Sequence, residues 1–266
     1  MITLKEIWDN CKVPEKSFRS LFQTRNAVSD RLQTSHRPTM NSIAAATPRI
    51  DIEHSRFNMV EQQIRPWEVL DPSVLELLMR MRREDFVPAE HRALAFADLE
   101  IPLGHGEAML SPKLEARMLQ ELMLNEGDSI LEIGTGSGYM TALLAGLGRH
   151  VYSVDIVPEF TRSAAPKLAA ASIRNITLET GDAAHGWDKH GPYDVIVLTG
   201  SVPVLPESFQ LSLKPGGRLL AVVGTAPAMQ ARLITSVGNN AFRSVTLFET
   251  CIPPLKNAQR LQRFVF

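Results

Sequence analysis

The amino-acid sequence predicts an α/β fold built on a doubly wound, mostly parallel sheet. Two observations carry this prediction. Five short apolar runs recur between residues 130 and 223, and helix-forming segments separate them. A glycine-rich turn follows the first run and leads into the first helix. Strands that alternate with helices at this spacing pair in parallel through right-handed crossovers.

The glycine-rich turn lies within residues 129–140. The run 130–133 is typical of a buried strand, glycine occupies positions 134, 136 and 138, and residues 139–145 favour a helix. Glycine has no Cβ, so the chain can turn sharply and a ligand can approach its amides. The first N–H groups of the helix point back at the turn. This is the Rossmann-like arrangement of a nucleotide-type cofactor site.

The elements beyond this turn follow in order. We expect further strands at 151–155, 176–182, 193–199 and 218–223, with helices at 160–171 and 206–213. Pro166 predicts that the first of these helices is kinked or broken, because proline cannot donate within a helix. Two more β-rich runs, 231–237 and 244–250, flank Gly238-Asn239-Asn240, which favours a hairpin turn. These runs would extend the sheet on its edge.

A mostly helical segment is expected before the glycine turn. Apolar periodicity begins at residue 57 and predicts a helix that Pro66 ends. Asp71-Pro72 is typical of a helix start, with aspartate as the N-cap and proline at the first helical position. Residues 101–106 are expected to form a loop, and Ser111-Pro112 to start another helix.

Residues 1–55 differ from the rest of the chain, because basic residues outnumber acidic ones and apolar periodicity is weak. We expect a flexible N-terminal extension here; a transit peptide is a weaker alternative, since such segments avoid acids. Met40 begins a more neutral run, so a further hypothesis places the natural start there, which intact-mass analysis would test. The expected organisation is an extension at 1–55, a helical substrate-side segment at 56–124, a Rossmann-like cofactor-binding core at 125–225 and a β-rich extension at 226–266.

Composition excludes several classes of function. The net charge of −1 gives no bulk positive field for nucleic acid or anionic lipid. No apolar run approaches the ~18 residues that a membrane span needs. The two cysteines, Cys11 and Cys251, form neither a disulfide framework nor a zinc motif. We therefore expect a cytoplasmic enzyme with reduced thiols, no metal, and no nucleic-acid or membrane partner.

Three acidic residues indicate which cofactor binds. Asp155 ends the second strand, about 20 residues after the glycines, where a carboxylate accepts from ribose hydroxyls. Glu132 precedes the first glycine; it would repel a pyrophosphate but attract an ammonium or sulfonium group. Asp182 ends the third strand and can accept from an adenine amino group, or else cap the next helix. Together with the G-x-G-x-G spacing, these features favour S-adenosyl-L-methionine over a dinucleotide.

The predicted cofactor-binding set combines the glycine turn with the ends of the second, third and fourth strands. Its members are Glu132, Gly134, Thr135, Gly136, Ser137, Gly138, Asp155, Ile156, Asp182, Ala183 and Thr199.

These residues resemble a known family. The run 131–139, Leu-Glu-Ile-Gly-Thr-Gly-Ser-Gly-Tyr, is similar to the first motif of class I methyltransferases, in the form typical of protein-L-isoaspartate O-methyltransferases. The resemblance extends from about Met59 to Phe266. It is supported by the segments 83–88, 101–106, 112–118, 193–199, 213–217 and 252–255. The resemblance implies a protein-repair enzyme that methylates the carboxyl group of isoaspartyl residues in damaged proteins or peptides.

The chain departs from the family pattern on the acceptor side. The family usually carries Thr-Ile-Ser-Gln-Pro where this chain has Ala-Met-Leu-Ser-Pro at 108–112. Ala108 and Leu110 therefore replace the two hydroxyl residues by the transferred methyl group. Ser111 could supply a displaced hydroxyl, or it could simply be the N-cap of the helix that starts at Pro112.

Two residues are therefore the catalytic candidates, Ser111 as a hydroxyl and His105 as a base. A carboxylate acceptor needs no base, whereas a phenol or amine would need one, for which His105, His185 and His190 are the candidates. Two alternatives to isoaspartyl methylation remain open at this point. One is a class I methyltransferase with a small-molecule or different protein acceptor, and the other is a cofactor-binding protein without catalysis.

Overall fold

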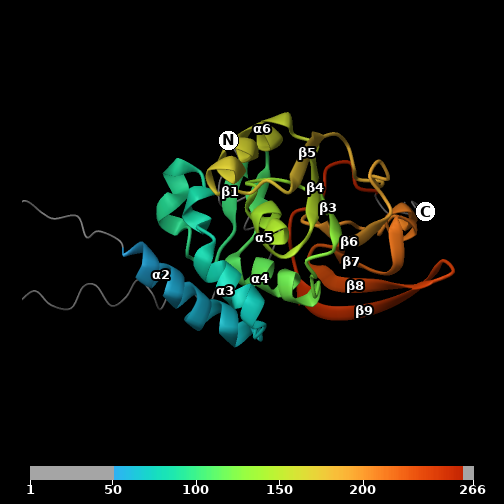
Figure 1. Ribbon diagram of the computed structural model, residues 1–266, viewed down its shortest axis with the longest axis horizontal. Coiled ribbons are helices and arrows are strands. Elements are labelled where there is room, and N and C mark those ends of the chain that lie inside the picture. Colours follow the sequence, from blue (N-terminus) through green and yellow to red (C-terminus); the bar gives the residue numbers. More distant parts are fainter. Residues whose placement is uncertain (1–50, 260–266) are drawn as a thin grey trace, which may run out of the picture. The chain divides into compact units, whose positions relative to one another are not determined.

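The computed structural model describes residues 51–259, and a seven-stranded sheet forms its centre (Figure 1). The strand order is β5-β4-β3-β6-β7-β8-β9. The strands are β3 (Ser129–Ile133), β4 (His150–Asp155), β5 (Ile176–Thr180), β6 (Tyr193–Leu198), β7 (Leu213–Thr225), β8 (Ala228–Gly238) and β9 (Ala241–Thr250). The first five pair in parallel, while β8 and β9 are antiparallel. The predicted α/β class, with its β-rich extension, is confirmed.

The order of the strands reverses at β3. The chain proceeds outward from β3 to β4 and β5, and then returns so that β6 lies on the other side of β3. Ile133 pairs with Val154 of β4 and with Leu198 of β6, so the three strands end side by side. Ligands of open α/β sheets bind in the crevice outside such a reversal, at the carboxyl edge of the strands.

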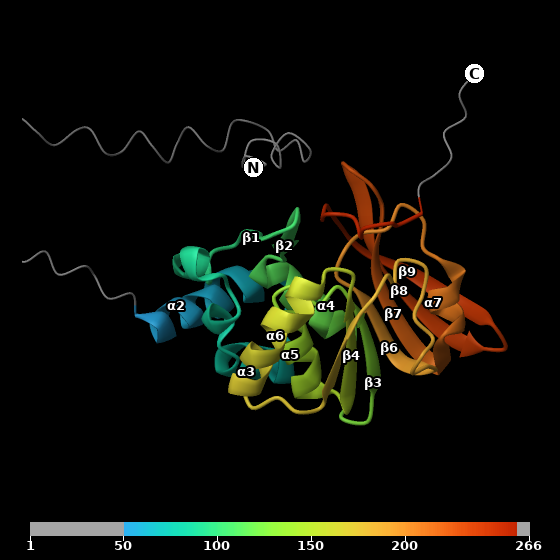
Figure 2. The same cartoon turned by 90° about the horizontal axis from the view of Figure 1, so that it is seen from above.

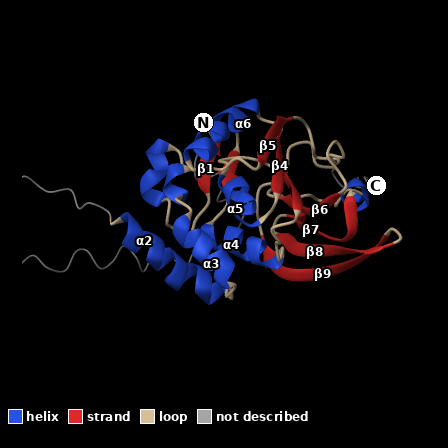
Figure 3. Cartoon of the chain, viewed as in Figure 1, coloured by secondary structure: helices blue, strands red, loops and turns tan. Residues whose placement is uncertain are grey.

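Helices cover both faces of the sheet. Figure 2 shows α5 and α6 beside β3 and β4 on one face, with α7 on the other, and Figure 3 distinguishes the helices, in blue, from the strands, in red. The helices are α2 (Ile52–Met59), which continues as a π-turn (Val60–Ile64), α3 (Pro72–Arg80), α4 (Pro112–Glu121), α5 (Tyr139–Leu147), α6 (Pro158–Ala170) and α7 (Glu207–Leu211). Short 3-10 turns lie at Arg65–Trp67, Arg83–Asp85 and Ala89–Leu94. Within residues 51–259, no helix combines the length and apolar character needed to cross a bilayer.

The predicted start of α3 is confirmed in detail. The Asp71 carboxylate accepts from the N–H groups of Ser73 and Val74, at 2.8 and 3.3 Å. Pro72 occupies the first helical position, where its missing N–H would have no partner in any case. In α6, by contrast, the break that Pro166 predicted does not occur. Pro166 is exposed, so water can solvate the carbonyl that loses its helical partner.

Residues 101–106 do not form the simple loop that the sequence predicted. They contribute to an antiparallel hairpin of β1 (Ile101–Gly104) and β2 (Glu107–Met109). The residues at its turn have positive φ, including His105 at +56°. The hairpin predicted at Gly238-Asn239-Asn240 is confirmed, because Asn239 and Asn240 join β8 to β9 with φ of +52° and +55°. The predictions for residues 1–50, including Cys11 and the start at Met40, lie outside the described residues.

Candidate active site

The glycine turn lies at the reversal of the strand order, between the end of β3 and the start of α5. Gly134 donates its N–H to the carbonyl of Val154, at 2.8 Å, and has a φ of +102°. A Cβ at this position would lie 2.2 Å from the Thr199 hydroxyl oxygen. Glycine is therefore required here both by the backbone conformation and by the close approach of β6.

Asp155 fastens the glycine turn to the end of β4. Its Oδ2 accepts from the N–H of Gly136 and its Oδ1 from that of Val157, both at 2.9 Å. Burial raises the pKa of this carboxyl group, while the two backbone hydrogen bonds act in the opposite direction. A carboxylate has about four lone-pair sites, so each oxygen can still accept from a further hydroxyl.

Thr199 and Asp182 complete this edge of the sheet. The Thr199 hydroxyl donates to the carbonyls of Ile133 and Gly134, at 2.9 and 2.8 Å, which ties β6 to the turn. Asp182 caps no helix; its Oδ1 accepts from the N–H of Ala184 and its Oδ2 from the Asn257 amide. Asp182 is exposed, so its carboxylate is accessible to a ligand.

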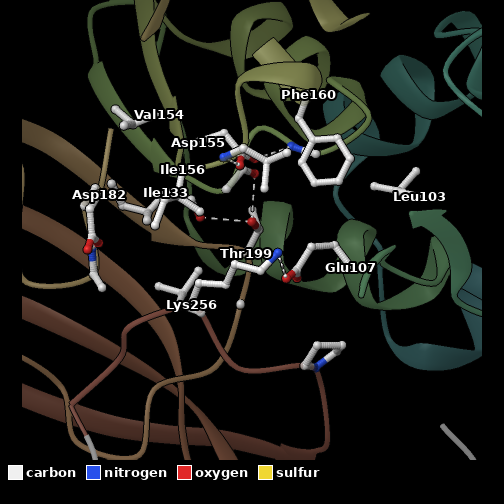
Figure 4. A pocket seen from close by; sticks show the side chains of 18 of the residues that line it. Leu103, Glu107, Ile133, Val154, Asp155, Ile156, Phe160, Asp182, Thr199 and Lys256 are labelled. Carbon is white, nitrogen blue, oxygen red and sulfur yellow. Dashed lines mark hydrogen bonds and ion pairs between the residues drawn. The ribbon is translucent and has the colours of Figure 1, made fainter. Parts of the chain in front are cut away.

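These groups surround a cavity, which Figure 4 shows from close by. Seven of the predicted cofactor residues line it: Gly134, Gly136, Asp155, Ile156, Asp182, Ala183 and Thr199. The other lining residues are Leu103, Glu107, Ala108, Leu110, Ile133, Val154, Val157, Phe160, Gly181, Ala184, Gly200, Pro253, Leu255 and Lys256.

The cavity fits an adenosyl donor. Asp155 offers unused acceptor sites where two ribose hydroxyls would lie, and Asp182 offers a carboxylate for an adenine amino group. Gly134 and Gly136 line the cavity without a side chain, so a ligand can approach their backbone closely. Apolar side chains, including those of Ile156 and Phe160, form much of the wall.

Glu132 does not line the cavity, which corrects the expected contact with the ammonium or sulfonium of the donor. It is fully buried, and its Oε2 accepts from the Thr141 hydroxyl on α5. Successive side chains of a strand point to opposite faces, and Ile133 takes the cavity side. Burial raises the pKa of Glu132 to about 8, against hydrogen bonds from Ser153 and Thr141.

Thr135, Ser137 and Gly138 also lie behind the cavity rather than on its wall. The Thr135 hydroxyl lies 2.7 Å from that of Ser153 on β4. Ser137 Oγ accepts from an N–H at the start of α5, and a Cβ on Gly138 would lie 2.9 Å from that of Ala164. These three residues therefore shape the turn from behind.

Neither catalytic candidate lines the cavity. Ser111 is the N-cap residue of α4 by position, but its side chain makes no capping hydrogen bond. His105 is exposed at the tip of the β1–β2 hairpin, and its ring packs edge-on against Phe160, at 5.5 Å between centroids. His185 and His190 are outside the lining as well. The sequence named these residues because they lie close along the chain to site motifs, but their side chains do not reach the cavity.

The wall of the cavity around the 108–112 motif also contains two residues, Glu107 and Lys256, that the sequence did not single out. Ala108 and Leu110, which stand where the family usually has hydroxyl residues, line this wall as expected, and Glu107 precedes them on β2. Lys256 reaches Glu107 from the C-terminal segment, with 3.0 Å between Nζ and Oε1. Residues 252–255 are similar to the family's closing segment, and Pro253 and Leu255 line the cavity, so this similarity was the available signal for this wall.

A buried arginine holds the acceptor-side backbone in place. Arg83 is fully buried and donates to the carbonyls of Leu110 and Ala95, at 2.6 and 2.9 Å. Its guanidinium also pairs with Glu115 on α4. Burial raises the pKa of Glu115 to about 7, while the charge of Arg83 lowers it.

Comparison with known proteins identifies the family. The Protein-L-isoaspartate(D-aspartate) O-methyltransferase family matches residues 54–256, which is more than half of the chain. The chain belongs to this family. It is an S-adenosyl-L-methionine-dependent methyltransferase, which confirms the enzyme class and the donor expected from the sequence.

Individual relatives of this methyltransferase agree with the assignment. The Protein-L-isoaspartate O-methyltransferase of Myxococcus xanthus is 42% identical over 165 residues, which cover 62% of this chain and 78% of that protein. Protein-L-isoaspartate O-methyltransferase 1 of an Anaeromyxobacter strain is 39% identical over 173 residues, 65% of this chain and 82% of that protein. A Plasmodium falciparum β-aspartate methyltransferase structure, in complex with S-adenosyl-L-homocysteine, shares the fold: its TM-score is 0.65 at 18% identity, covering 77% of this chain and 98% of that one.

Proposed function

We propose that this methyltransferase transfers the methyl group of S-adenosyl-L-methionine to the free carboxyl group of isoaspartyl residues in proteins or peptides. The match to the isoaspartyl methyltransferase family over residues 54–256 carries this proposal. The cavity at the carboxyl edge of the sheet supplies the donor half of the site. The alternative of an unrelated acceptor, which Ala108 and Leu110 left open, is not favoured by the relatives.

The donor would be held at three points of the cavity. Asp155 accepts from the ribose hydroxyls, Asp182 from the adenine amino group, and the backbone at Gly134 and Gly136 lies against the methionyl part. When bound, S-adenosyl-L-methionine supplies an activated methyl group on a sulfonium. Glu132 is not proposed to contact the donor; it is buried and accepts from the Thr141 hydroxyl, which links β3 to α5.

The chain's own residues need to align the acceptor and exclude water. An isoaspartyl carboxyl group is already ionised near neutral pH, so no base has to remove a proton. His105, His185 and His190 do not line the cavity, and this agrees with an acceptor that needs no base. Alignment of the reacting atoms by itself contributes several kcal/mol, on the order of 7, to such a displacement.

The physiological role that follows is repair of damaged proteins in the cytoplasm. A methyl ester of an isoaspartyl residue is labile, so methylation opens a route away from the damaged linkage. The chain has only two cysteines, a usage that agrees with a reducing compartment. The proposed partner is an isoaspartyl-containing polypeptide rather than nucleic acid or a membrane.

An isoaspartyl peptide assay tests the proposal. The full chain is incubated with S-adenosyl-L-methionine carrying a labelled methyl group and a short isoaspartyl peptide, and base-released methanol is counted. The same peptide with an ordinary aspartate is the control substrate. We expect labelled methanol only with the isoaspartyl peptide. A chain that binds S-adenosyl-L-homocysteine but gives no labelled ester would refute carboxyl methylation of this substrate and favour another acceptor.

A further inference from the structure

The acceptor side of the cavity contains one positive charge that the proposed function does not yet use. Among the described residues that line the cavity, four are charged: Glu107, Asp155, Asp182 and Lys256. Three of them are carboxylates. An anionic acceptor therefore enters a site whose fixed charges repel it, unless the lysine compensates.

Two contacts hold the Lys256 ammonium at the edge of the cavity. Its Nζ lies 3.0 Å from Glu107 Oε1 and donates to the carbonyl of His105, at 2.9 Å. Both partners belong to the β1–β2 hairpin, so the ammonium joins that hairpin to the C-terminal segment. Figure 4 shows the lysine and Glu107 pointing toward one another beside the cavity. An ammonium has three donors, and these two contacts leave the third for a ligand.

Two residues that line the cavity after Glu107 carry no hydroxyl group. Ala108 and Leu110 line the cavity, and neither side chain can donate a hydrogen bond. A carboxylate that enters a partly closed site without donors has a large desolvation cost. A positive donor beside Ala108 would offset this cost, since hydrogen bonds to ionised groups are about twice as strong as neutral ones.

We propose that Lys256 binds the acceptor carboxylate and determines the preference for an anionic acceptor, with Glu107 positioning its ammonium. This inference rests on the proposed function. One carboxylate oxygen accepts from the third Lys256 donor, and the other faces the methyl group. That second oxygen forms a bond to the methyl carbon as the carbon–sulfur bond breaks, and the bonding electron pair stays on sulfur. No proton moves, and the products are a methyl ester and a thioether.

Three variants of the full chain test the proposal by steady-state kinetics. Lys256→Gln removes the charge, Lys256→Arg keeps it, and Lys214→Gln is a matched control. Lys214 has nearly the same side-chain exposure, 36% against 37%, and a comparable ion pair, with Asp194, but does not line the cavity. For Lys256→Gln we expect the KM of the isoaspartyl peptide to rise about tenfold or more, the effect of losing a charge-assisted hydrogen bond. The KM of the donor should change less than twofold, and Lys256→Arg should retain most of the peptide affinity.

A neutral analogue gives a second readout that a purely structural role would not move. The same peptide with its isoaspartyl carboxyl group amidated is used as a competitive inhibitor. The unsubstituted chain should bind the anionic peptide much more tightly than the amide. Lys256→Gln should lose most of this preference, because only the anionic form interacts with the ammonium.

The possible outcomes separate the two proposals. If the unsubstituted chain esterifies the isoaspartyl peptide but Lys256→Gln leaves its KM and the preference over the amide unchanged, only the role of Lys256 is overturned. A rise in the donor KM by the same factor as the peptide KM would also overturn it, because Lys256 would then bind the donor. If the unsubstituted chain forms no ester, the proposed function and the inference on Lys256 both fail.

Discussion

Replacement of Asp155 by alanine is the sharpest test of the donor site. Only 7% of Asp155 is exposed, and both carboxylate oxygens accept from backbone N–H groups. Alanine removes the group that we expect to accept from the ribose hydroxyls. It also leaves the N–H groups of Gly136 and Val157 without partners.

The two losses affect different measured quantities, the affinity for the donor and the free energy of unfolding. A hydrogen bond to a charged group contributes about 1.5–3 kcal/mol, so donor affinity should fall roughly 10- to 150-fold. Each buried N–H left unsatisfied costs about 1–3 kcal/mol, which lowers the free energy of unfolding and not the intrinsic affinity. Binding therefore has to be measured where the variant is fully folded.

Calorimetric titration with S-adenosyl-L-homocysteine measures the affinity, and urea denaturation the stability. Asp71→Ala is a matched control, because Asp71 also accepts from two backbone N–H groups but does not line the cavity. We expect both variants to lose stability and only Asp155→Ala to lose affinity. A folded Asp155→Ala variant whose dissociation constant stays within twofold would refute the placement of the ribose at the end of β4.

Two further predictions concern the glycine turn and the strand that leads to it. Gly134→Ala places a Cβ against the Thr199 hydroxyl at a φ of +102°, so it should lower the melting temperature and abolish donor binding. Gly216→Ala is the control, because its φ is +79° but an added Cβ would meet no other atom, so this variant should lose only the stability that backbone strain costs. Equal decreases in melting temperature in the two variants would contradict the steric reasoning. Burial raises the pKa of Glu132 from 4.5 to about 8 in the folded state, so between these pH values the native state binds more protons at this group than the unfolded state does. The contribution of Glu132 to the free energy of unfolding therefore falls as the pH rises from about 4.5 to 8. Glu132→Gln lacks this dependence and should gain stability relative to the wild type over that range, by at most about 1.4 kcal/mol per pH unit; parallel urea-denaturation profiles would show that the carboxyl group stays ionised.

The sequence was most informative where local pattern and structure coincide. The strand, glycine turn and helix at residues 129–147 follow directly from short-range preferences, because glycine at 134, 136 and 138 permits a backbone that other residues resist. The position of Asp155 against this turn was predicted for the same reason, since an acid at the end of the second parallel strand must meet the turn after the first.

Sequence reasoning failed where the direction of a side chain decides its role. Glu132 was placed in the site from its charge and its position beside the glycines, although strand alternation directs it toward α5. His105 was named from its loop, but the tight turn with φ of +56° leaves it exposed. The hairpin itself was missed because two strands of three and four residues leave little periodicity to detect.

The sequence by itself thus determined the fold class, the donor and the family, since these depend on motifs that are contiguous along the chain. The tertiary structure alone showed that Lys256 and Glu107 meet in the wall of the cavity. Lys256 and the hairpin carbonyl of His105 are 151 positions apart. Ser201 holds the C-terminal segment beside the cavity, because its N–H donates to the carbonyl of Pro253, at 2.9 Å, and its carbonyl accepts from the N–H of Leu255, at 2.8 Å. A contact between such distant residues is fixed by packing of the whole sheet, and no local pattern encodes it.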